Sequence, residues 1–259
     1  MIHGKGTPIE FTDELMYADG TPVQVIRFAN EMDVLSSAIY NGGRVRTTCI
    51  LIMQVPKDYM SDDPHHDVQE VIDILALPKE TIGLMTAAEV EYVFNVTHHS
   101  HEGHEAYAAV TAGLSNQVVA GDVLVDWESR HKVSVGKAMR LYGERGPPRF
   151  HAGTINTVAV LDVPLTLAGK ANAIIAATEA KTAAMNIMGF RETGTTSDAV
   201  AIVSPVGEDS NYAGTGSYAG IAMCKAVRDA VCRALIIRDD FPEGTDDGTR
   251  RRIRAEYGL

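Results

Sequence analysis

The stretch GTINTVAVLDVPLTLAGKANAIIAATEAKTAAMNIM, residues 153–188, carries the clearest indication of fold class in the chain. It opens with an apolar strand pattern, TINTVAVL, and continues from about Leu167 into an Ala-rich helical pattern. A second strand pattern follows at residues 198–203, and a second helical pattern at about residues 217–237. This β-α-β-α order predicts an αβ half over residues 151–238.

Upstream of this stretch the sequence favours β structure. Residues 1–55 alternate apolar and polar positions around two turn signals, Asp-Gly at 19–20 and Asn-Gly-Gly at 41–43, and this pattern predicts four strands. A capping Asp followed by Pro then predicts a helix over about residues 64–77. The first half of the chain, residues 1–142, is therefore predicted to be rich in strands.

A histidine-rich segment, HHSHEGH at residues 98–104, separates two further strand patterns at residues 89–96 and 105–114. We expect this segment to be a loop or a turn. Neutral imidazoles coordinate zinc, but the spacing is one residue shorter than that of the HExxH motif. A general acid or base and ordinary solvent-exposed histidines are the other interpretations. The ligands of a metal, if one binds, are His98, His101 and His104.

We predict an α+β fold with layered mixed sheets and helices on the outer faces, and a four-layer αββα stack fits this pattern. Residues 1–240 are expected to form a single domain, with residues 241–259 as a charged, solvated tail. The segment GERGPPRFHAG at residues 143–153 predicts a long surface loop, although a domain boundary also fits it.

Composition excludes several classes of protein. The 259 residues contain 45% hydrophobic residues, which is enough for a substantial core and excludes wholesale disorder. A net charge of −11 argues against a nucleic-acid partner. The longest dense apolar run, Cys49 to Val55, is too short to span a bilayer. Because the three cysteines lack the spacing of a disulfide framework, we expect a reduced, cytoplasmic protein without a membrane partner.

The Ala-rich helical pattern is polar on two sides. Glu179 shares one face with Asn172 and Asn186, whereas Lys181 projects about half a turn away. Because apolar residues fill the remaining directions, we expect either Glu179 or Lys181 to point inward. A buried charge needs a partner, so an interior salt bridge is one interpretation, and a general base or substrate anchor at Glu179 is the other.

Two polar loops are further candidate site segments. GTTSD at residues 194–198 precedes a strand, and YAGTGS at residues 212–217 precedes a helix whose free N–H groups could hold an anion or a developing oxyanion. A simple helix cap is the alternative. Neither loop matches a phosphate-binding or dinucleotide motif. Three serines are candidate nucleophiles outside any GxSxG elbow: Ser36, Ser115 and Ser197.

Eight segments, taken in order, resemble the adenosylcobinamide amidohydrolase family of corrinoid salvage. They are VLSSAIYNGG (34–43), QVPKDY (54–59), IGLMTAA (82–88), VTAGLSN (110–116), GTINTVAVLDVPL (153–165), ATEAKTAA (177–184), GTTSDAVAI (194–202) and YAGTGSYAG (212–220). The resemblance implies hydrolysis of the amide that joins aminopropanol to a corrin propionate, which turns adenosylcobinamide into adenosylcobyric acid. The corrinoid is then the substrate; no cofactor is required, and a metal remains open.

Amide hydrolysis needs a base, an acid for the leaving amine and donors for the oxyanion. The candidate bases are Glu179 and His101, and the candidate acids are Lys181 and Tyr212. A broad, amide-fringed corrin needs a wide cleft with scattered polar partners. The candidate substrate-binding residues are Ser36, Asn41, Gly42, Asn116, Gly153, Thr154, Asn156, Thr196, Ser197, Asp198 and Gly214. We expect the polar loops and Glu179 to converge on one pocket large enough for a tetrapyrrole.

Two other functions remain open at this point. One is a non-catalytic corrinoid-binding protein that has the same cleft without a competent acid and base. The other is a metal-dependent amidase of different specificity that uses the His98–His104 cluster. A homo-oligomer is also compatible with the sequence.

Overall fold

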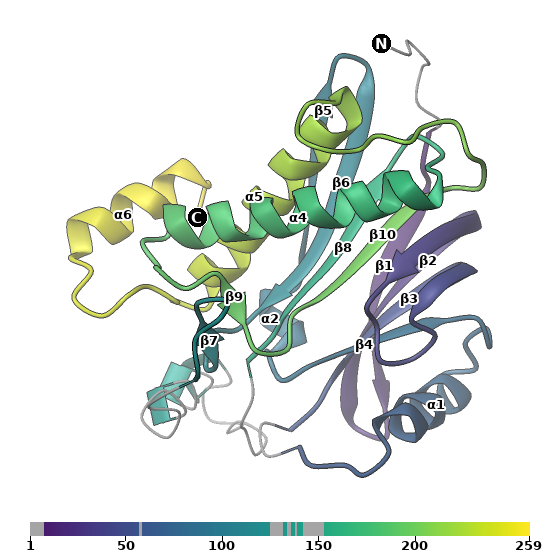
Figure 1. Cartoon of the computed structure of the whole chain (residues 1–259). Coiled ribbons are helices and arrows are strands. Elements are labelled where there is room, and N and C mark those ends of the chain that lie inside the picture. Colours follow the sequence, from purple (N-terminus) through teal and green to yellow (C-terminus); the bar gives the residue numbers. More distant parts are fainter. Residues whose placement is uncertain (1–7, 57–58, 125–131, 134–135, 138, 142–152) are drawn as a thin grey trace.

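A computed structural model describes residues 8–56, 59–124, 132–133, 136–137, 139–141 and 153–259 (Figure 1). Their main feature is a mixed sheet of eight strands in the order β4-β3-β2-β10-β8-β6-β5, with β1 paired to β2. Its strands are β1 (Phe11–Ala18), β2 (Thr21–Ser36), β3 (Gly43–Gln54), β4 (Ile82–Thr86), β5 (Asn95–His101), β6 (His104–Ala112), β8 (Ile155–Leu161) and β10 (Ala199–Pro205). A separate two-stranded ladder joins β7 (Gln117–Val118) and β9 (Gly194–Thr195). The helices are α1 (Pro64–Ile74), α2 (Val90–Val93), α4 (Leu167–Ile187), α5 (Tyr218–Ile237) and α6 (Asp247–Glu256).

The sheet bends along β2, the longest of these strands. Its first half pairs with β1 and β3, its second half pairs with β3 and β10, and the register with β3 shifts between Arg27 and Met32. Because of the bend, β4 contacts β8 although three strands lie between them in the hydrogen-bonded order. The two halves enclose an apolar cluster that includes Ile50 and Leu84 from one half and Val158 from the other.

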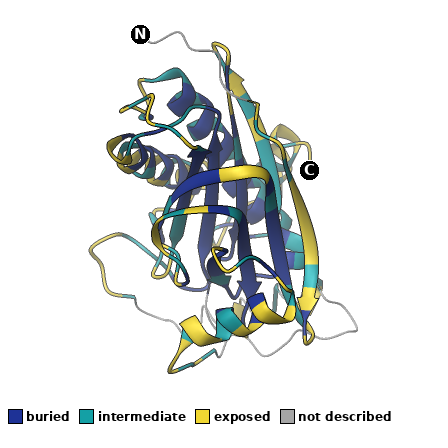
Figure 2. Cartoon of the chain, turned by 90° about the vertical axis from the view of Figure 1, so that its right-hand side faces the viewer, coloured by how far each residue is buried: buried dark blue, intermediate teal, exposed yellow. Residues whose placement is uncertain are grey.

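Helices cover the outer faces of both halves. α1 packs on β2 and β3, whereas α4 and α5 pack on the strands β5, β6, β8 and β10 (Figure 1). The layer order is therefore α, β, β, α, with both β layers belonging to one bent sheet. The buried residues gather in the middle of these layers, and the exposed ones lie mainly on the outer strand and helix surfaces (Figure 2). The predicted α+β class is confirmed.

The predicted helices are found where capping and periodicity placed them. The prediction for residues 64–77 corresponds to α1, whose N-cap Asp63 accepts a hydrogen bond from the His66 N–H (3.1 Å). The other two predicted helices correspond to α4 and α5, which begin after Thr166 and Ser217, and both caps accept an N–H three residues on. In the described part of the chain, no helix is long and apolar enough to cross a membrane.

Three local predictions are wrong. Four strands were predicted in the first 55 residues, but their described part contains three, because residues 21–36 form one continuous strand, β2. Residues 98–101 continue β5, and only Glu102 and Gly103 form the turn, with φ of 48° and 82°. The predicted strand at 89–96 contains the short helix α2. Of the predicted loop at 143–153, all but Gly153 lies outside the described residues.

The prediction of a solvated tail at residues 241–259 is also wrong. α6 packs on the rest of the protein through Ile253, which is 5% exposed and belongs to the same apolar cluster as α4 and α5. Arg254 lies over the Phe241 ring and pairs with Asp239 (2.9 Å). The charges of this segment predicted a solvated tail, whereas the helix docks through Ile253 and through arginines that pair with Asp239.

Candidate active site

Polar segments that are distant in the sequence meet at one edge of the sheet. β8 and β10 are parallel and begin at this edge, and β6, which is antiparallel to β8, ends there. The segments 113–116, 153–156 and 194–198 therefore lie together. The Gly113 N–H donates to the Thr154 carbonyl oxygen (3.1 Å), which joins the first two segments directly.

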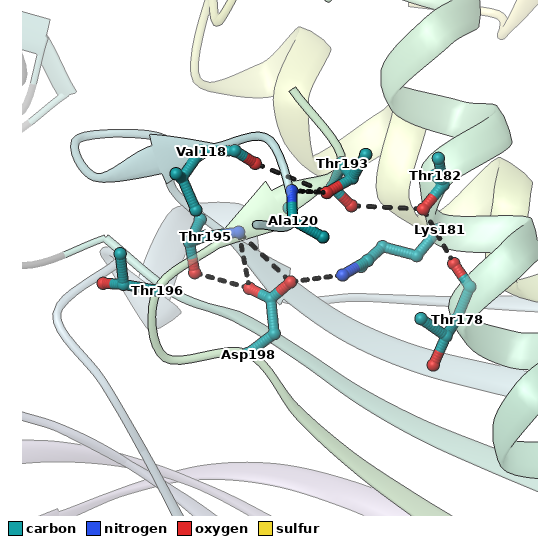
Figure 3. Close-up of a pocket in the computed structure, with 10 residues that line it drawn as sticks. Val118, Ala120, Thr178, Lys181, Thr182, Thr193, Thr195, Thr196 and Asp198 are labelled. Atoms are coloured by element: carbon teal, nitrogen blue, oxygen red, sulfur yellow. Dashed lines mark hydrogen bonds and ion pairs between the residues drawn. The ribbon is translucent and has the colours of Figure 1, made fainter. Parts of the chain in front are cut away.

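The charged centre of this edge is an ion pair between Lys181 and Asp198. Lys181 projects from α4 and is only 8% exposed. The Asp198 carboxylate also accepts hydrogen bonds from the backbone N–H groups of Ile155 (3.1 Å) and Thr195 (3.1 Å). These donors orient the carboxylate, so the position of the lysine ammonium is set by two strands and a helix at once (Figure 3).

Gly194 makes this ion pair geometrically possible. A Cβ at Gly194 would lie 2.2 Å from Asp198 Oδ2 and 2.4 Å from Lys181 Nζ, which is well inside van der Waals contact. Only a residue without a side chain leaves space for both charged groups against the backbone of β9.

Further hydroxyl groups lie at the same edge of the sheet as the ion pair. Thr154 Oγ1 and Ser197 Oγ lie 2.6 Å apart, and Ser197 Oγ also donates to the Gly153 carbonyl oxygen (3.1 Å). The Asn116 amide donates to Thr196 Oγ1 (2.7 Å), while its own Oδ1 is buried and has no hydrogen-bond partner among the described residues. The site thus combines a nucleophile-type hydroxyl pair with a cation and a carboxylate.

A pocket of about 440 Å³ opens beside these groups (Figure 3). It is lined by Val118, Ala120, Thr178, Lys181, Thr182, Thr193, Gly194, Thr195, Thr196 and Asp198. On the α4 side, the Thr178 hydroxyl donates to the Ile174 carbonyl oxygen (2.8 Å) and the Thr182 hydroxyl to that of Thr178 (3.1 Å). Because these hydrogens are already used, this wall offers methyl groups and acceptor lone pairs only. The pocket has one charged end and one largely apolar wall.

The structure brings together most of the predicted binding residues. Those that lie at this edge are Asn116, Gly153, Thr154, Thr196, Ser197 and Asp198, together with the predicted acid Lys181. Two more lie near it inside the sheet. Asn156 is fully buried and donates to the Met85 carbonyl oxygen (2.9 Å), and its Oδ1 finds no partner in the part of the chain that the structure describes. Ser36 is buried at the end of β2.

Four predicted residues lie at the opposite edge of the sheet: His101, His104, Tyr212 and Gly214. β6 begins at that edge, because Ala106 pairs with Leu161 at the end of β8. α4 begins there as well and runs 14 residues, about 21 Å, from Leu167 to Lys181. Tyr212 is 73% exposed. The expectation that both polar loops converge on one pocket is therefore wrong, since the loops before the strand and before the last helix lie at different edges.

Glu179 and Lys181 separate as their spacing requires. The side chains of residues two apart in a helix point in directions about 200° apart. Lys181 points into the pocket, so Glu179 faces outward and is exposed. The expectation that one of the two points inward is confirmed for Lys181. Lys170, near the beginning of α4, is also buried, and its ammonium donates to Ser204 Oγ (2.6 Å). The role of Glu179 as a base stays a prediction without a place in this pocket.

Asn41 and Gly42 belong to a turn rather than to the pocket. The Asn41 amide donates to the carbonyl oxygens of Lys79 and Thr81 (2.9 Å each), which ties the turn after β2 to the segment before β4. At Gly42, a Cβ would lie 2.3 Å from the Ala38 carbonyl oxygen. Both residues shape the backbone here.

The histidines do not gather into a metal site. His98 and His101 are three residues apart on β5 and so point to opposite faces of the strand. His99 pairs with Asp229 (2.7 Å) and His104 with Asp162 (3.2 Å). Within the ranges that the structure describes, no group of three His, Cys, Asp or Glu side chains could hold a metal ion.

Sequence reasoning missed the apolar side of the pocket. Thr178 and Thr182 line it from α4, and Val118 and Thr193 line it from the chain around β7 and β9. The available signal was the position of Thr178, which lies three residues before Lys181 and four before Thr182, because residues three and four apart are neighbours on a helix surface.

Comparison with known proteins places the chain in a fold and in a family. In the solved structure of a Burkholderia sp. beta-aminopeptidase, the fold matches with a TM-score of 0.51 at 15% identity, over 98% of this chain and 93% of that one. The adenosylcobinamide amidohydrolase of Methanosarcina mazei is 27% identical over 227 residues, 84% of this chain and 96% of the relative. An uncharacterized protein of Methanocaldococcus jannaschii is 28% identical over 239 residues, 85% and 88% of the two chains.

The sequence similarities show a hydrolase that acts on amide bonds, and the ion pair and the hydroxyls at this edge of the sheet suit such chemistry. Residues 9–241 match the adenosylcobinamide amidohydrolase family. The chain belongs to this family, as its eight ordered segments predicted.

Proposed function

We propose that this protein hydrolyses the amide between aminopropanol and the corrin propionate of adenosylcobinamide, and that it releases adenosylcobyric acid for reuse in corrinoid salvage. The match of residues 9–241 to the family supports the substrate class. The observation that carries the chemistry is the Lys181–Asp198 ion pair at one end of a pocket, with the Thr154–Ser197 hydroxyl pair at the same edge of the sheet.

In this proposal the pocket receives the amide-bearing arm of the substrate. The methyl groups on the α4 wall contact the methylene carbons, and the charged end faces the polar amide. The Lys181 ammonium is a charge-assisted donor, so it stabilises the negative oxygen of the tetrahedral intermediate or protonates the departing amine. Asp198 keeps the ammonium in place. Lys181 takes the role of acid because Tyr212 lies at the opposite edge.

The nucleophile in this proposal comes from the hydroxyl pair. An oxygen of Thr154 or Ser197 adds to the amide carbon, aminopropanol leaves with a proton, and water then cleaves the resulting ester. Because Ser197 Oγ donates to the Gly153 carbonyl oxygen, the short contact has Thr154 Oγ1 as its donor. This hydrogen bond orients the two hydroxyls, and the proton of the attacking hydroxyl leaves with the aminopropanol nitrogen.

The experiment is incubation with adenosylcobinamide followed by mass detection of adenosylcobyric acid. We expect Lys181→Met and Asp198→Asn each to lower kcat by about 100-fold, the scale of a lost acid or oxyanion donor. Tyr212→Phe is the matched control, because it removes a hydroxyl at the other edge and should leave kcat unchanged. Binding of adenosylcobinamide without any product would instead identify the non-catalytic corrinoid-binding protein.

Two single variants test the hydroxyl pair. Thr154→Val and Ser197→Ala remove one hydroxyl each with little change of shape. We expect one variant to lose turnover almost completely, and the other to keep more than about a tenth of it. If both keep near-normal turnover, water attacks the amide directly and the covalent route is wrong.

We also propose that turnover requires no metal ion, because the charged groups of the pocket supply the donor and the carboxylate. Elemental analysis after chelation, with activity measured on the same sample, tests this. Loss of activity that zinc restores would favour a metal-dependent amidase. A reducing, cytoplasmic location fits the thiols, since all three cysteines are unpaired.

A further inference from the structure

Helix α4 exposes an apolar face that leads directly to the pocket. Leu167, Ala171, Ile175 and Thr178 follow one another at intervals of four, four and three residues, so they lie along one side of the helix. All four are exposed, Leu167 at 49% and Ile175 at 58%. The opposite side of α4 is packed on α5 and β10. A surface without any charge along three turns is unusual in a chain with net charge −11.

The face is continuous with the wall of the pocket. Thr178 belongs to both, and Ile175 lies one helical turn before it. Since the hydroxyl of Thr178 donates to the Ile174 carbonyl oxygen, the surface stays apolar from Ile175 into the pocket.

One carboxylate borders this face. Glu179 is exposed, lies four residues after Ile175 and therefore neighbours it on the helix surface. Within the described residues, no cation pairs with Glu179. The surface next to the pocket thus combines an exposed aliphatic side chain with a negative charge that no cation of the described ranges pairs with.

The pocket is too small for the whole substrate of the proposed function. Its volume of about 440 Å³ lies at the low end of the range for small-ligand sites, and it suits one amide arm. A corrin ring joins four five-membered rings around cobalt and is several times larger than one of its arms. When the arm is in the pocket, the ring must lie on the surface around the mouth.

We propose that the α4 surface formed by Ile175, Thr178 and Glu179 is the binding surface for the corrin ring. The apolar edge of the ring packs on Ile175 and on the Thr178 methyl, and the Glu179 carboxylate faces the positive charge of cobinamide. This inference rests on the proposed function and specifies how that site selects a tetrapyrrole substrate. It gives Glu179 a role in binding rather than in proton transfer.

The test compares KM and kcat for adenosylcobinamide among three variants. Ile175→Ser should raise KM about tenfold and leave kcat within twofold, because binding to the ring is equal in the ground and transition states. Glu179→Gln should raise KM at low salt, and the difference from wild type should shrink as salt increases. Leu167→Ser is the matched control, since it removes the same kind of exposed side chain about 12 Å further from the pocket. It should change neither constant.

A second substrate separates ring binding from arm binding. N-(2-hydroxypropyl)propionamide contains the scissile amide but no ring, so its kcat/KM should be equal in wild type and Ile175→Ser. Thermal unfolding confirms that each variant is folded. The inference is overturned if KM for adenosylcobinamide is unchanged in both Ile175→Ser and Glu179→Gln while wild type turns over normally. A fall in kcat for Glu179→Gln would restore it as a base.

Two further measurements keep the proposals distinguishable. If wild type produces no adenosylcobyric acid, the proposed function fails. The binding surface is then tested alone by measuring the affinity for cobinamide in an equilibrium titration followed by cobinamide absorbance. Equal affinity of wild type and Ile175→Ser for cobinamide would overturn the surface. Sedimentation measurements test whether a second copy of the chain occupies this α4 surface instead. If Ile175→Ser turns a dimer into a monomer without changing KM, the surface is an interface between two copies and the inference is wrong.

Discussion

Replacing Gly194 with Ala should abolish most of the activity without unfolding the protein. The added Cβ would lie 2.2 Å from Asp198 Oδ2, whereas an ordinary contact is at least 3.4 Å, so the carboxylate must move by about 3.4 − 2.2 = 1.2 Å. Because Asp198 holds Lys181, the ammonium moves with it. A misplacement of about 1 Å in a catalytic group reduces turnover by roughly 100-fold. We therefore expect kcat for adenosylcobinamide to fall by about that factor.

The φ angle of Gly194 is not in the left-handed region, so alanine causes no backbone strain there and the effect comes from space alone. Gly216→Ala is the matched control, because nothing lies within 4 Å of its added Cβ and its φ is also suitable for alanine. The assay is product formation by mass detection, with thermal unfolding on the same preparations. If Gly194→Ala is folded and keeps at least half of wild-type kcat, the geometry of the ion pair does not matter for catalysis and the reasoning is refuted.

Three other predictions concern buried groups. Arg238→Leu should destabilise the protein by about 3–5 kcal/mol in urea unfolding, because Glu89 and Asp240 lose a cation that is itself buried; a change below 1 kcal/mol contradicts this. Burial alone would raise the pKa of Asp240, but Arg238 and Lys137 hold it below the ordinary value of 3.8. The ionised Asp240 carboxylate therefore stabilises the folded state above about pH 4, and this contribution is lost as the pH falls further. The free energy of unfolding, measured between pH 3 and about 6, should show the decline. Burial, with a smaller contribution from Glu179, raises the pKa of the Cys224 thiol to about 11, so iodoacetamide should label it at pH 8 only after denaturant is added.

The helices α1, α4 and α5 could be predicted because their signals are short-range. Thr166 and Ser217 cap α4 and α5, and Asp63 caps α1, through hydrogen bonds that span three residues. The apolar run of β8 likewise indicated a strand, and in the structure that strand is buried on both faces. The family could be predicted for a related reason: its short motifs and their order are read directly from the sequence.

The misplaced predictions share a long-range cause. β2 continues through 16 residues because it pairs with β1, β3 and β10 in turn, and no pattern within residues 21–36 records those partners. α6 was taken for a tail because the groups that hold it lie outside it: Ile253 packs on the apolar cluster that includes α4 and α5, and Arg250 and Arg254 pair with Asp239. Tertiary contacts overrode the local charge pattern in this segment.

The amino-acid order alone specified α1, α4 and α5, most strands and the family, since capping, hydrophobic periodicity and motif spacing act over a few residues. Which polar segments share a site depends on strand pairing. β6 runs antiparallel to β8, and β10 runs parallel to it, so residues 113–116, 153–156 and 194–198 meet at one edge. The same pairing places residues 212–217 and the histidine turn at the other edge. Hydrogen bonds between strands far apart in sequence set this arrangement, and only the folded chain contains them.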